Sequence, residues 1–259
     1  MGSKISKAMD RSRRESDREP KAPKDRAYGT SASEVQTPRI RPPISPTPEV
    51  RPSDSEEYQT LASEVFLALP ETDSRVVMFT SAQVGTGTST VAREFAWTIA
   101  ERSELRTLLV DGDLRAPDQH RAFSIERSPG LTDHVLGGEP LGSCLHNLSG
   151  SRLSVMPAGR EAMAPPRVFG DERIKGLIEE LRDEYEYIVF DVPAVLSYSE
   201  GFTLSRSVDG VLLVVRSGGT KRALVERSIA LLEDAGATVL GAVLNRRKFY
   251  IPQFVYDRL

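Results

Sequence analysis

Short runs of β-branched and aliphatic residues recur along this chain, and helical patterns lie between several of them. The runs predicted as strands are residues 75–80, 107–110, 153–156, 187–190, 211–215 and 239–244. The helical patterns are residues 56–67, 89–102, 172–182 and 221–235. Strands that are apolar on both faces and alternate with helices are typical of buried parallel sheets. The sequence therefore predicts an α/β fold with a doubly wound, mostly parallel sheet.

The first part of the chain has a different composition. Residues 1–54 are rich in Arg, Lys, Ser, Glu and Pro and show almost no apolar periodicity. Such a segment cannot bury enough apolar surface to offset the entropy lost on ordering, so we expect a disordered basic and proline-rich tail. The α/β domain is expected at residues 55–248, with a short C-terminal tail at 249–259, and its size suits a single domain.

The overall composition narrows the class of protein. The net charge of −3 and the sequence pI of about 5.8 do not favour a nucleic-acid partner. The single cysteine, Cys144, cannot form an internal disulfide and suits a reducing compartment. No apolar run reaches the ~18–20 residues that span a bilayer. We therefore expect a cytoplasmic protein that reaches the inner face of a membrane only through a partner.

A glycine-rich turn joins the first predicted strand to the helix that follows it. It reads Ser-Ala-Gln-Val-Gly-Thr-Gly-Thr-Ser-Thr at residues 81–90. The backbone N–H groups of such a turn, together with the helix dipole, favour a phosphate. The spacing fits a Walker A loop with Ser89 as the magnesium-binding hydroxyl, but Thr88 stands where the lysine belongs. The candidate nucleotide contacts in this loop are Gly85, Thr86, Gly87, Thr88, Ser89 and Thr90.

Acidic residues follow two other predicted strands. Asp111 and Asp113 come after residues 107–110, and Asp191 comes after residues 187–190. Because ligands of such sheets bind at the carboxyl ends of the strands, these carboxylates suit a hydrated magnesium ion beside phosphates. The period of a strand predicts that Asp111 and Asp113 point to the same side. We predict Ser89, Asp111 and Asp191 as metal ligands. Asp111, Asp113 and Asp191 are the catalytic candidates if the chain is active.

Taken in order, these motifs make residues 55–248 resemble the cytoplasmic domain of bacterial tyrosine autokinases. These are capsule and exopolysaccharide regulators related to the MinD and ParA ATPases. The run Asp-x-Asp-x-Arg-x-Pro at residues 111–117 resembles their second magnesium motif, and ParA-type proteins do not usually carry its Arg-x-Pro ending. Further segments resemble the family at residues 129–138, 153–159, 187–193, 208–216 and 240–245.

The resemblance implies a set of ligands and partners. ATP or ADP would bind with magnesium, Arg115 would contact the nucleotide, and Asn245 would lie near the adenine. The family also implies homo-oligomers and a membrane polysaccharide co-polymerase or chain-length regulator as partner. Its C-terminal tyrosine cluster is reduced here to Tyr250 and Tyr256, the candidate phosphorylation sites.

The departures from the family concern activity. Besides Thr88, Gln59 and Ala62 stand where a family helix that supports ring assembly carries arginines. Removing a charge-stabilising group costs roughly 10²–10³ in rate, although Arg115 or a residue of a partner subunit could substitute. Whether the chain is an enzyme stays open at this stage. The alternatives are a degenerate nucleotide binder that regulates exopolysaccharide synthesis, an active tyrosine autokinase, and a positioning ATPase like ParA or MinD.

Overall fold

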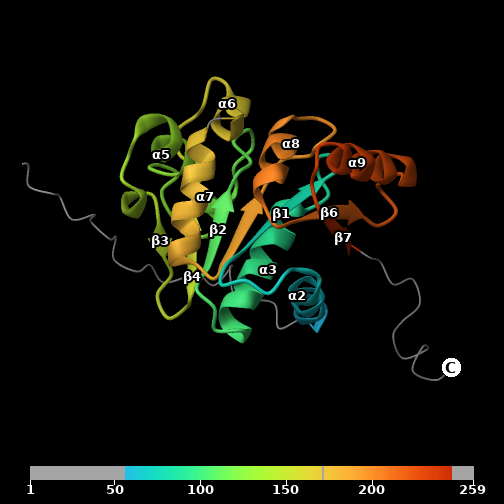
Figure 1. Cartoon of the computed structure of the whole chain (residues 1–259), viewed down its shortest axis with the longest axis horizontal. Helices are drawn as coiled ribbons and strands as arrows, with labels where there is room; N and C mark the ends of the chain where they lie inside the picture. The colour runs from blue at the N-terminus through green and yellow to red at the C-terminus, as the bar shows by residue number, and fades with distance from the viewer. Residues whose placement is uncertain (1–55, 171, 247–259) are drawn as a thin grey trace, which may run out of the picture. The chain divides into compact units, whose positions relative to one another are not determined.

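A computed structural model describes residues 56–170 and 172–246 of the chain (Figure 1). The expectations for the N-terminal tail and for Tyr250 and Tyr256 fall outside these described residues. Within them, no helix is both long and apolar enough to cross a membrane.

The described part is built on one seven-stranded sheet with the order β3-β4-β2-β5-β1-β6-β7 (Figure 1). The strands are β1 (Arg75–Ser81), β2 (Thr107–Asp111), β3 (His146–Asn147), β4 (Leu153–Met156), β5 (Tyr187–Asp191), β6 (Gly210–Arg216) and β7 (Val239–Asn245). All neighbouring pairs are parallel except β3 and β4. The predicted α/β, mostly parallel fold is confirmed. The two-residue β3 was not predicted, because it is too short to show a strand period.

The helices differ in how well the sequence predicts them. The long ones lie within two residues of the predicted bounds and are α2 (Glu56–Ala68), α3 (Thr88–Arg102), α7 (Glu172–Glu184) and α9 (Arg222–Asp234). The short ones were not predicted and are α4 (Gln119–Ala122), α5 (Leu131–Gly137), α6 (Pro165–Gly170), α8 (Glu200–Leu204), η2 (Leu141–Ser143) and η3 (Ser205–Ser207). One or two turns do not make a recognisable helical pattern.

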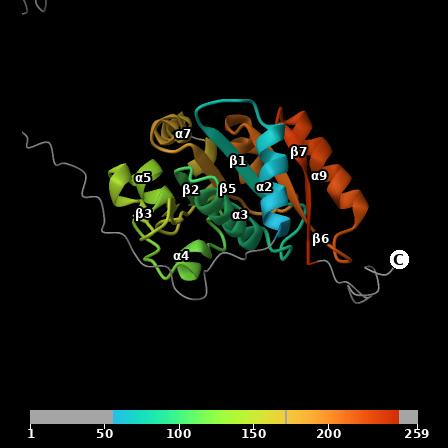
Figure 2. The same ribbon diagram turned by 90° about the horizontal axis from the view of Figure 1, so that it is seen from below.

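Different helices cover the two faces of the sheet. Val77 and Phe79 of β1 pack in one apolar cluster with α2 and α3, which lie side by side in Figure 2. Val76 and Met78 pack in the other cluster with α5 to α9. All four side chains are completely buried. Burial on both faces explains why β1 reads as a continuous apolar run, and it leaves the carboxyl ends of the central strands as the edge where polar residues gather.

Candidate functional site

The loop between β1 and α3 closes tightly at two glycines. Gly85 and Gly87 have φ angles of 81° and 88°, in the left-handed region that only glycine enters without steric cost. Gly87 caps α3, and a Cβ there would collide with the side-chain amide of Asn245. The backbone of the loop therefore forms a close cradle at the N-terminus of a 15-residue helix, which is a favourable place for a phosphate.

The threonines of this loop face one another. The Oγ1 atoms of Thr86 and Thr88 are 2.9 Å apart, and Thr86 is buried. Asn245, at the end of β7, donates from Nδ2 to the carbonyl oxygen of Thr86 over 2.8 Å. A threonine side chain is much shorter than a lysine and carries no charge. Position 88 therefore supplies a hydroxyl at the loop and no cation beyond it. Thr90 is exposed on the first turn of α3.

Asp111 and Asp191 end two neighbouring strands and are aligned in register. Both are buried, with relative exposures of 0% and 1%. Gln119 joins them, since its backbone N–H donates to Asp111 Oδ2 over 3.1 Å and its Nε2 donates to Asp191 Oδ2 over 2.8 Å. The same Nε2 donates to the carbonyl oxygen of Ser89, at 3.1 Å. In the described structure, Asp111 Oδ1 is buried without a hydrogen-bond partner.

Burial dominates the electrostatics of this pair. It raises the pKa of Asp111 well above the ordinary range, and the neighbouring Asp191 raises it further. Burial also raises the pKa of Asp191 to about 6, against the lowering effect of hydrogen bonds from Gln119 and Ser89. Two buried carboxylates are unfavourable when both are ionised, and a divalent cation would compensate them.

The few protein donors here suit a magnesium ion that keeps several waters, rather than a metal held by protein side chains alone. Ser89 stands beside Asp191 at the start of α3, and Asp111 presents the unpartnered oxygen. Between residues 56 and 246, leaving out 171, no group of three or more His, Cys, Asp or Glu side chains could hold a metal. Magnesium usually keeps several waters and takes only one or two carboxylates alongside substrate phosphates.

The strand alternation used to predict the direction of Asp113 stops before this residue. β2 ends at Asp111, so the period of two does not extend to Asp113. Its Oδ1 accepts hydrogen bonds from the backbone N–H groups of Arg115 and Ala116, at 3.2 and 3.0 Å. Asp113 therefore shapes the turn after β2, although it lies close enough to raise the pKa values of Asp111 and Asp191.

Arg115 is held by two residues that the sequence did not single out. Its Nε donates to Glu200 Oε1 over 2.8 Å, and its guanidinium lies 4.4 Å from the ring centroid of Tyr198. Glu200 is buried, with an exposure of 1%. The loop before Glu200 is tied to the end of β1, because Val195 N–H donates to the Ser81 carbonyl oxygen. Arg115 therefore reaches from the end of β2 to a loop anchored at the end of β1.

Gln119, Tyr198 and Glu200 had no signal in the sequence. Gln119 and Glu200 each begin a short helix, and Tyr198 lies in the loop before α8, where polar residues are common. The motif residues around them come from regular strand ends and are easier to recognise.

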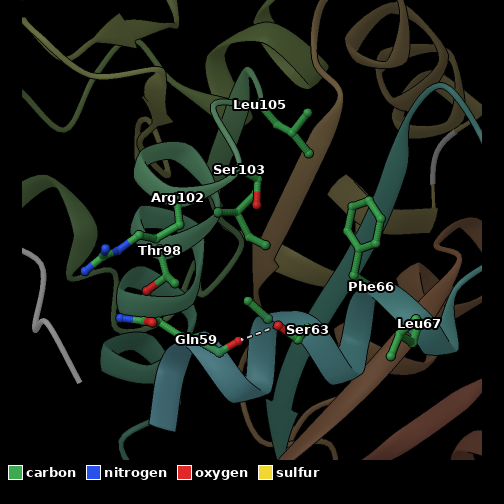
Figure 3. A pocket seen from close by; sticks show the side chains of 10 residues that line it. Gln59, Ser63, Phe66, Leu67, Thr98, Arg102, Ser103 and Leu105 are labelled. Carbon is green, nitrogen blue, oxygen red and sulfur yellow. Dashed lines mark hydrogen bonds between the residues drawn. The ribbon is translucent and has the colours of Figure 1, made fainter. Parts of the chain in front are cut away.

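A hollow lies between α2 and the C-terminal end of α3 (Figure 3). It is lined by Gln59, Ala62, Ser63, Phe66, Leu67, Thr98, Ile99, Arg102, Ser103 and Leu105. The hydrogen bond drawn there joins Ser63 Oγ to the Gln59 carbonyl oxygen within α2. The hollow lies at the opposite end of α3 from Gly87, so it is separate from the site of the buried carboxylates. It includes Gln59 and Ala62, the two positions where the resemblance described above implies arginines.

Comparison with known proteins identifies sequence relatives of this chain. No family model matches the chain. The chain is 30% identical over 200 residues to the tyrosine-protein kinase YwqD of Bacillus subtilis, covering 77% of this chain and 84% of that protein. It is also 30% identical over 196 residues to the tyrosine-protein kinase Etk of Escherichia coli, covering 75% of this chain but 27% of that protein.

Solved structures agree with the sequence relatives. The kinase domain of the Escherichia coli tyrosine kinase ETK superposes with a TM-score of 0.72 at 25% identity, covering 83% of this chain and 88% of that one. The cell division ATPase MinD of Pyrococcus furiosus superposes with a TM-score of 0.58 at 22% identity, covering 71% of this chain and 79% of that one. The likeness to MinD shows the shared fold alone.

Proposed function

This chain belongs to the bacterial tyrosine-protein kinase family, and on that premise we propose that it regulates exopolysaccharide or capsule synthesis as a nucleotide binder with impaired phosphoryl transfer. The observation that carries the proposal is the pairing of Thr88 with Thr86 in a loop that is otherwise closed around its glycines. The loop has the form of a phosphate cradle without the lysine that would reach the transferred phosphate.

We propose that ATP or ADP binds along the loop at residues 85–90, with Arg115 and Asn245 as further contacts. Ser89, Asp111 and Asp191 would hold magnesium, which neutralises phosphate charge when bound. Gln119 holds both carboxylates through the bonds described above. Burial favours the protonated form of the Asp111 carboxyl. A bound magnesium ion would favour the ionised form instead.

The missing lysine affects binding and transfer unequally. Losing one charge-assisted contact costs roughly 1.5–3 kcal/mol, or about 10–100-fold in affinity. The backbone amides of the loop, Ser89 and the two carboxylates remain for binding. Phosphoryl transfer depends almost entirely on positioning and charge stabilisation, so it suffers more. This difference supports binding with slow transfer or none.

An active tyrosine autokinase is the second candidate. The observation in its favour is that Asp111 and Asp191 are both buried and aligned at the strand ends. This candidate predicts phosphotyrosine at Tyr250 or Tyr256. A positioning ATPase of the ParA or MinD type is supported only by the shared fold.

We further propose that residues 55–248 act as one cytoplasmic domain that works with a membrane polysaccharide co-polymerase. The support is membership of the family and the coverage of only 27% of Etk, which contains much more than this domain. Gln59 and Ala62 lack the charge of the family arginines, so we propose that any homo-oligomer formed through α2 is weak. The net charge of −3 does not favour binding to nucleic acid, so we propose no nucleic-acid partner.

Calorimetry with magnesium and either ADP or ATP tests the proposal on wild type, Thr88→Lys and Asp111→Ala. We expect wild type to bind, Thr88→Lys to bind about tenfold more tightly, and Asp111→Ala to bind more weakly. Incubation with labelled ATP then measures transfer to tyrosine. Magnesium-dependent transfer by wild type that disappears in Asp111→Ala would reject impaired transfer and favour the autokinase.

A further inference from the structure

The residue that follows the last strand lies against the glycine-rich loop. Arg246 Nε is 3.7 Å from the position that a Cβ on Gly87 would occupy. Gly87 directly precedes Thr88, the position where a Walker A loop has its lysine. A cation from the distant end of the described chain is therefore brought next to the place where the loop lacks one.

Asn245 holds Arg246 in this place through both ends of its side-chain amide. Its Nδ2 donates to the Thr86 carbonyl oxygen over 2.8 Å, and its Oδ1 accepts from the backbone N–H of Arg246 over 2.7 Å. The loop and the backbone of Arg246 are thus connected by one amide. The same amide would collide with any side chain at position 87, so glycine, asparagine and arginine are fitted to one another.

The backbone of Arg246 is itself unusual. Its φ angle is 55°, in the left-handed region that residues other than glycine seldom adopt. Conformations of this kind persist where neighbouring contacts hold them, and they concentrate at ligand sites. Here the hydrogen bond that the Arg246 N–H donates to Asn245 Oδ1 is such a contact, and it holds Arg246 beside the loop.

Two other cations near the strand ends, Arg115 and Arg93, are already engaged by protein groups. Arg115 donates to the buried Glu200, and Arg93 donates from Nη1 to Gln119 Oε1 over 3.2 Å. Arg246 is exposed, and no acceptor for its guanidinium is seen among residues 56–170 and 172–246. Of these three cations, Arg246 is the one whose donors are open to an incoming anion.

We propose that Arg246 contacts the phosphates of a bound nucleotide and replaces the charge of the missing lysine, with Asn245 as its positioning residue. This inference rests on the proposed nucleotide site. A guanidinium offers paired N–H donors that match phosphate oxygens, so it can act from beside the loop rather than from within it. Its charge supports binding, whereas the lysine of a Walker A loop reaches the β- and γ-phosphates from the loop itself.

The test is calorimetry of magnesium and ADP with Arg246→Ala, Arg246→Lys and Arg222→Ala. Arg222 is a matched control, because its side chain is exposed on α9 and, among the described residues, pairs with Glu226 one turn away. We expect Arg246→Ala to weaken ADP binding about tenfold or more at ~0.05 M salt, and less at ~0.5 M, because salt screens an exposed ionic contact. Arg246→Lys should recover most of the affinity, and Arg222→Ala should match wild type.

The outcomes separate this inference from the proposed function. Binding by wild type that Arg246→Ala leaves unchanged overturns the inference alone. An equal loss at both salt concentrations, without recovery in Arg246→Lys, also overturns it, because the contact would then not be ionic. Failure of wild type to bind either ADP or ATP overturns the nucleotide site and this inference with it. Urea unfolding without nucleotide should be the same for all four proteins, which excludes a general loss of fold.

Discussion

Replacing Gln119 by leucine tests whether the buried carboxylates Asp111 and Asp191 depend on one amide. The Gln119 side chain is completely buried, donates to Asp191 Oδ2 and the Ser89 carbonyl oxygen, and accepts from Arg93. Leucine has a similar volume, so the change removes hydrogen bonds rather than packing. Its main consequence is that a buried carboxylate oxygen loses its donor.

The expected magnitude follows from that loss. A hydrogen bond to a charged group contributes about 1.5–3 kcal/mol, and an acceptor left buried without a partner adds to the cost. We therefore expect Gln119→Leu to lower the free energy of unfolding by about 2–4 kcal/mol at pH 7.5. For a domain of this size, each kcal/mol lowers Tm by roughly 2–4 °C, so Tm should fall by about 5–15 °C. At pH 5 the loss should be smaller, because Asp191 has a pKa of about 6 and is then mostly protonated.

Urea and thermal unfolding at the two pH values measure this difference in the metal-free protein. Gln83→Leu is the matched control, since Gln83 Nε2 makes one exposed hydrogen bond of 3.3 Å to the Gly219 carbonyl oxygen. It should change the free energy of unfolding by no more than about 0.5 kcal/mol. A Gln119→Leu protein as stable as the control, or equally destabilised at pH 5 and pH 7.5, would refute the role assigned to this amide.

Two further predictions concern single carboxylates. A carboxyl whose pKa is raised on folding binds its proton more tightly in the folded state, so Asp191 should make metal-free wild type about 1 kcal/mol more stable at pH 5 than at pH 7.5. Urea unfolding of Asp191→Asn should lack this increment, and an unchanged pH dependence would contradict the assignment. Asp209 accepts from the Val76 N–H over 2.7 Å and from Arg182 Nη2 over 2.7 Å. Asp209→Ala should therefore lower the free energy of unfolding by about 2 kcal/mol in urea, and a change below about 0.5 kcal/mol would show that solvent replaces both donors.

The regular elements could be predicted because their sequences repeat a simple pattern. Residues 76–79 are apolar without alternation, and the structure shows β1 buried on both faces. The helix after it begins directly after Gly87, the last glycine of the loop, as the glycine-rich turn indicates. The short α4 and α8 could not be predicted, since four or five residues have no period and depend on contacts with distant residues. The hydrogen bond from the Gln119 N–H to Asp111 is one such contact.

The residues of the candidate site also differ in how well the sequence predicts them. Asp111 and Asp191 could be placed together because carboxyl ends of parallel strands meet at one edge, and the register pairs them. The turn around Asp113 ended the strand earlier than alternation assumed. Glu200 and Arg246 reach the edge from after β5 and after β7, through contacts that only the folded chain creates. A single glutamate or arginine in an irregular segment has no neighbour in sequence that reveals its role.

Binding and phosphoryl transfer draw on different residues in this site. Ionising both buried carboxylates without a cation would cost stability, because burial raises the pKa values of Asp111 and Asp191. A bound cation removes that cost, so binding gains from residues that are present. Transfer needs a cation placed on the moving phosphoryl group, and position 88 offers none. A ligand that binds only the folded state stabilises it by RT ln(1 + [L]/Kd). Stabilisation by magnesium and nucleotide without transfer is therefore the combined result that a regulatory protein requires, whereas an autokinase must show both.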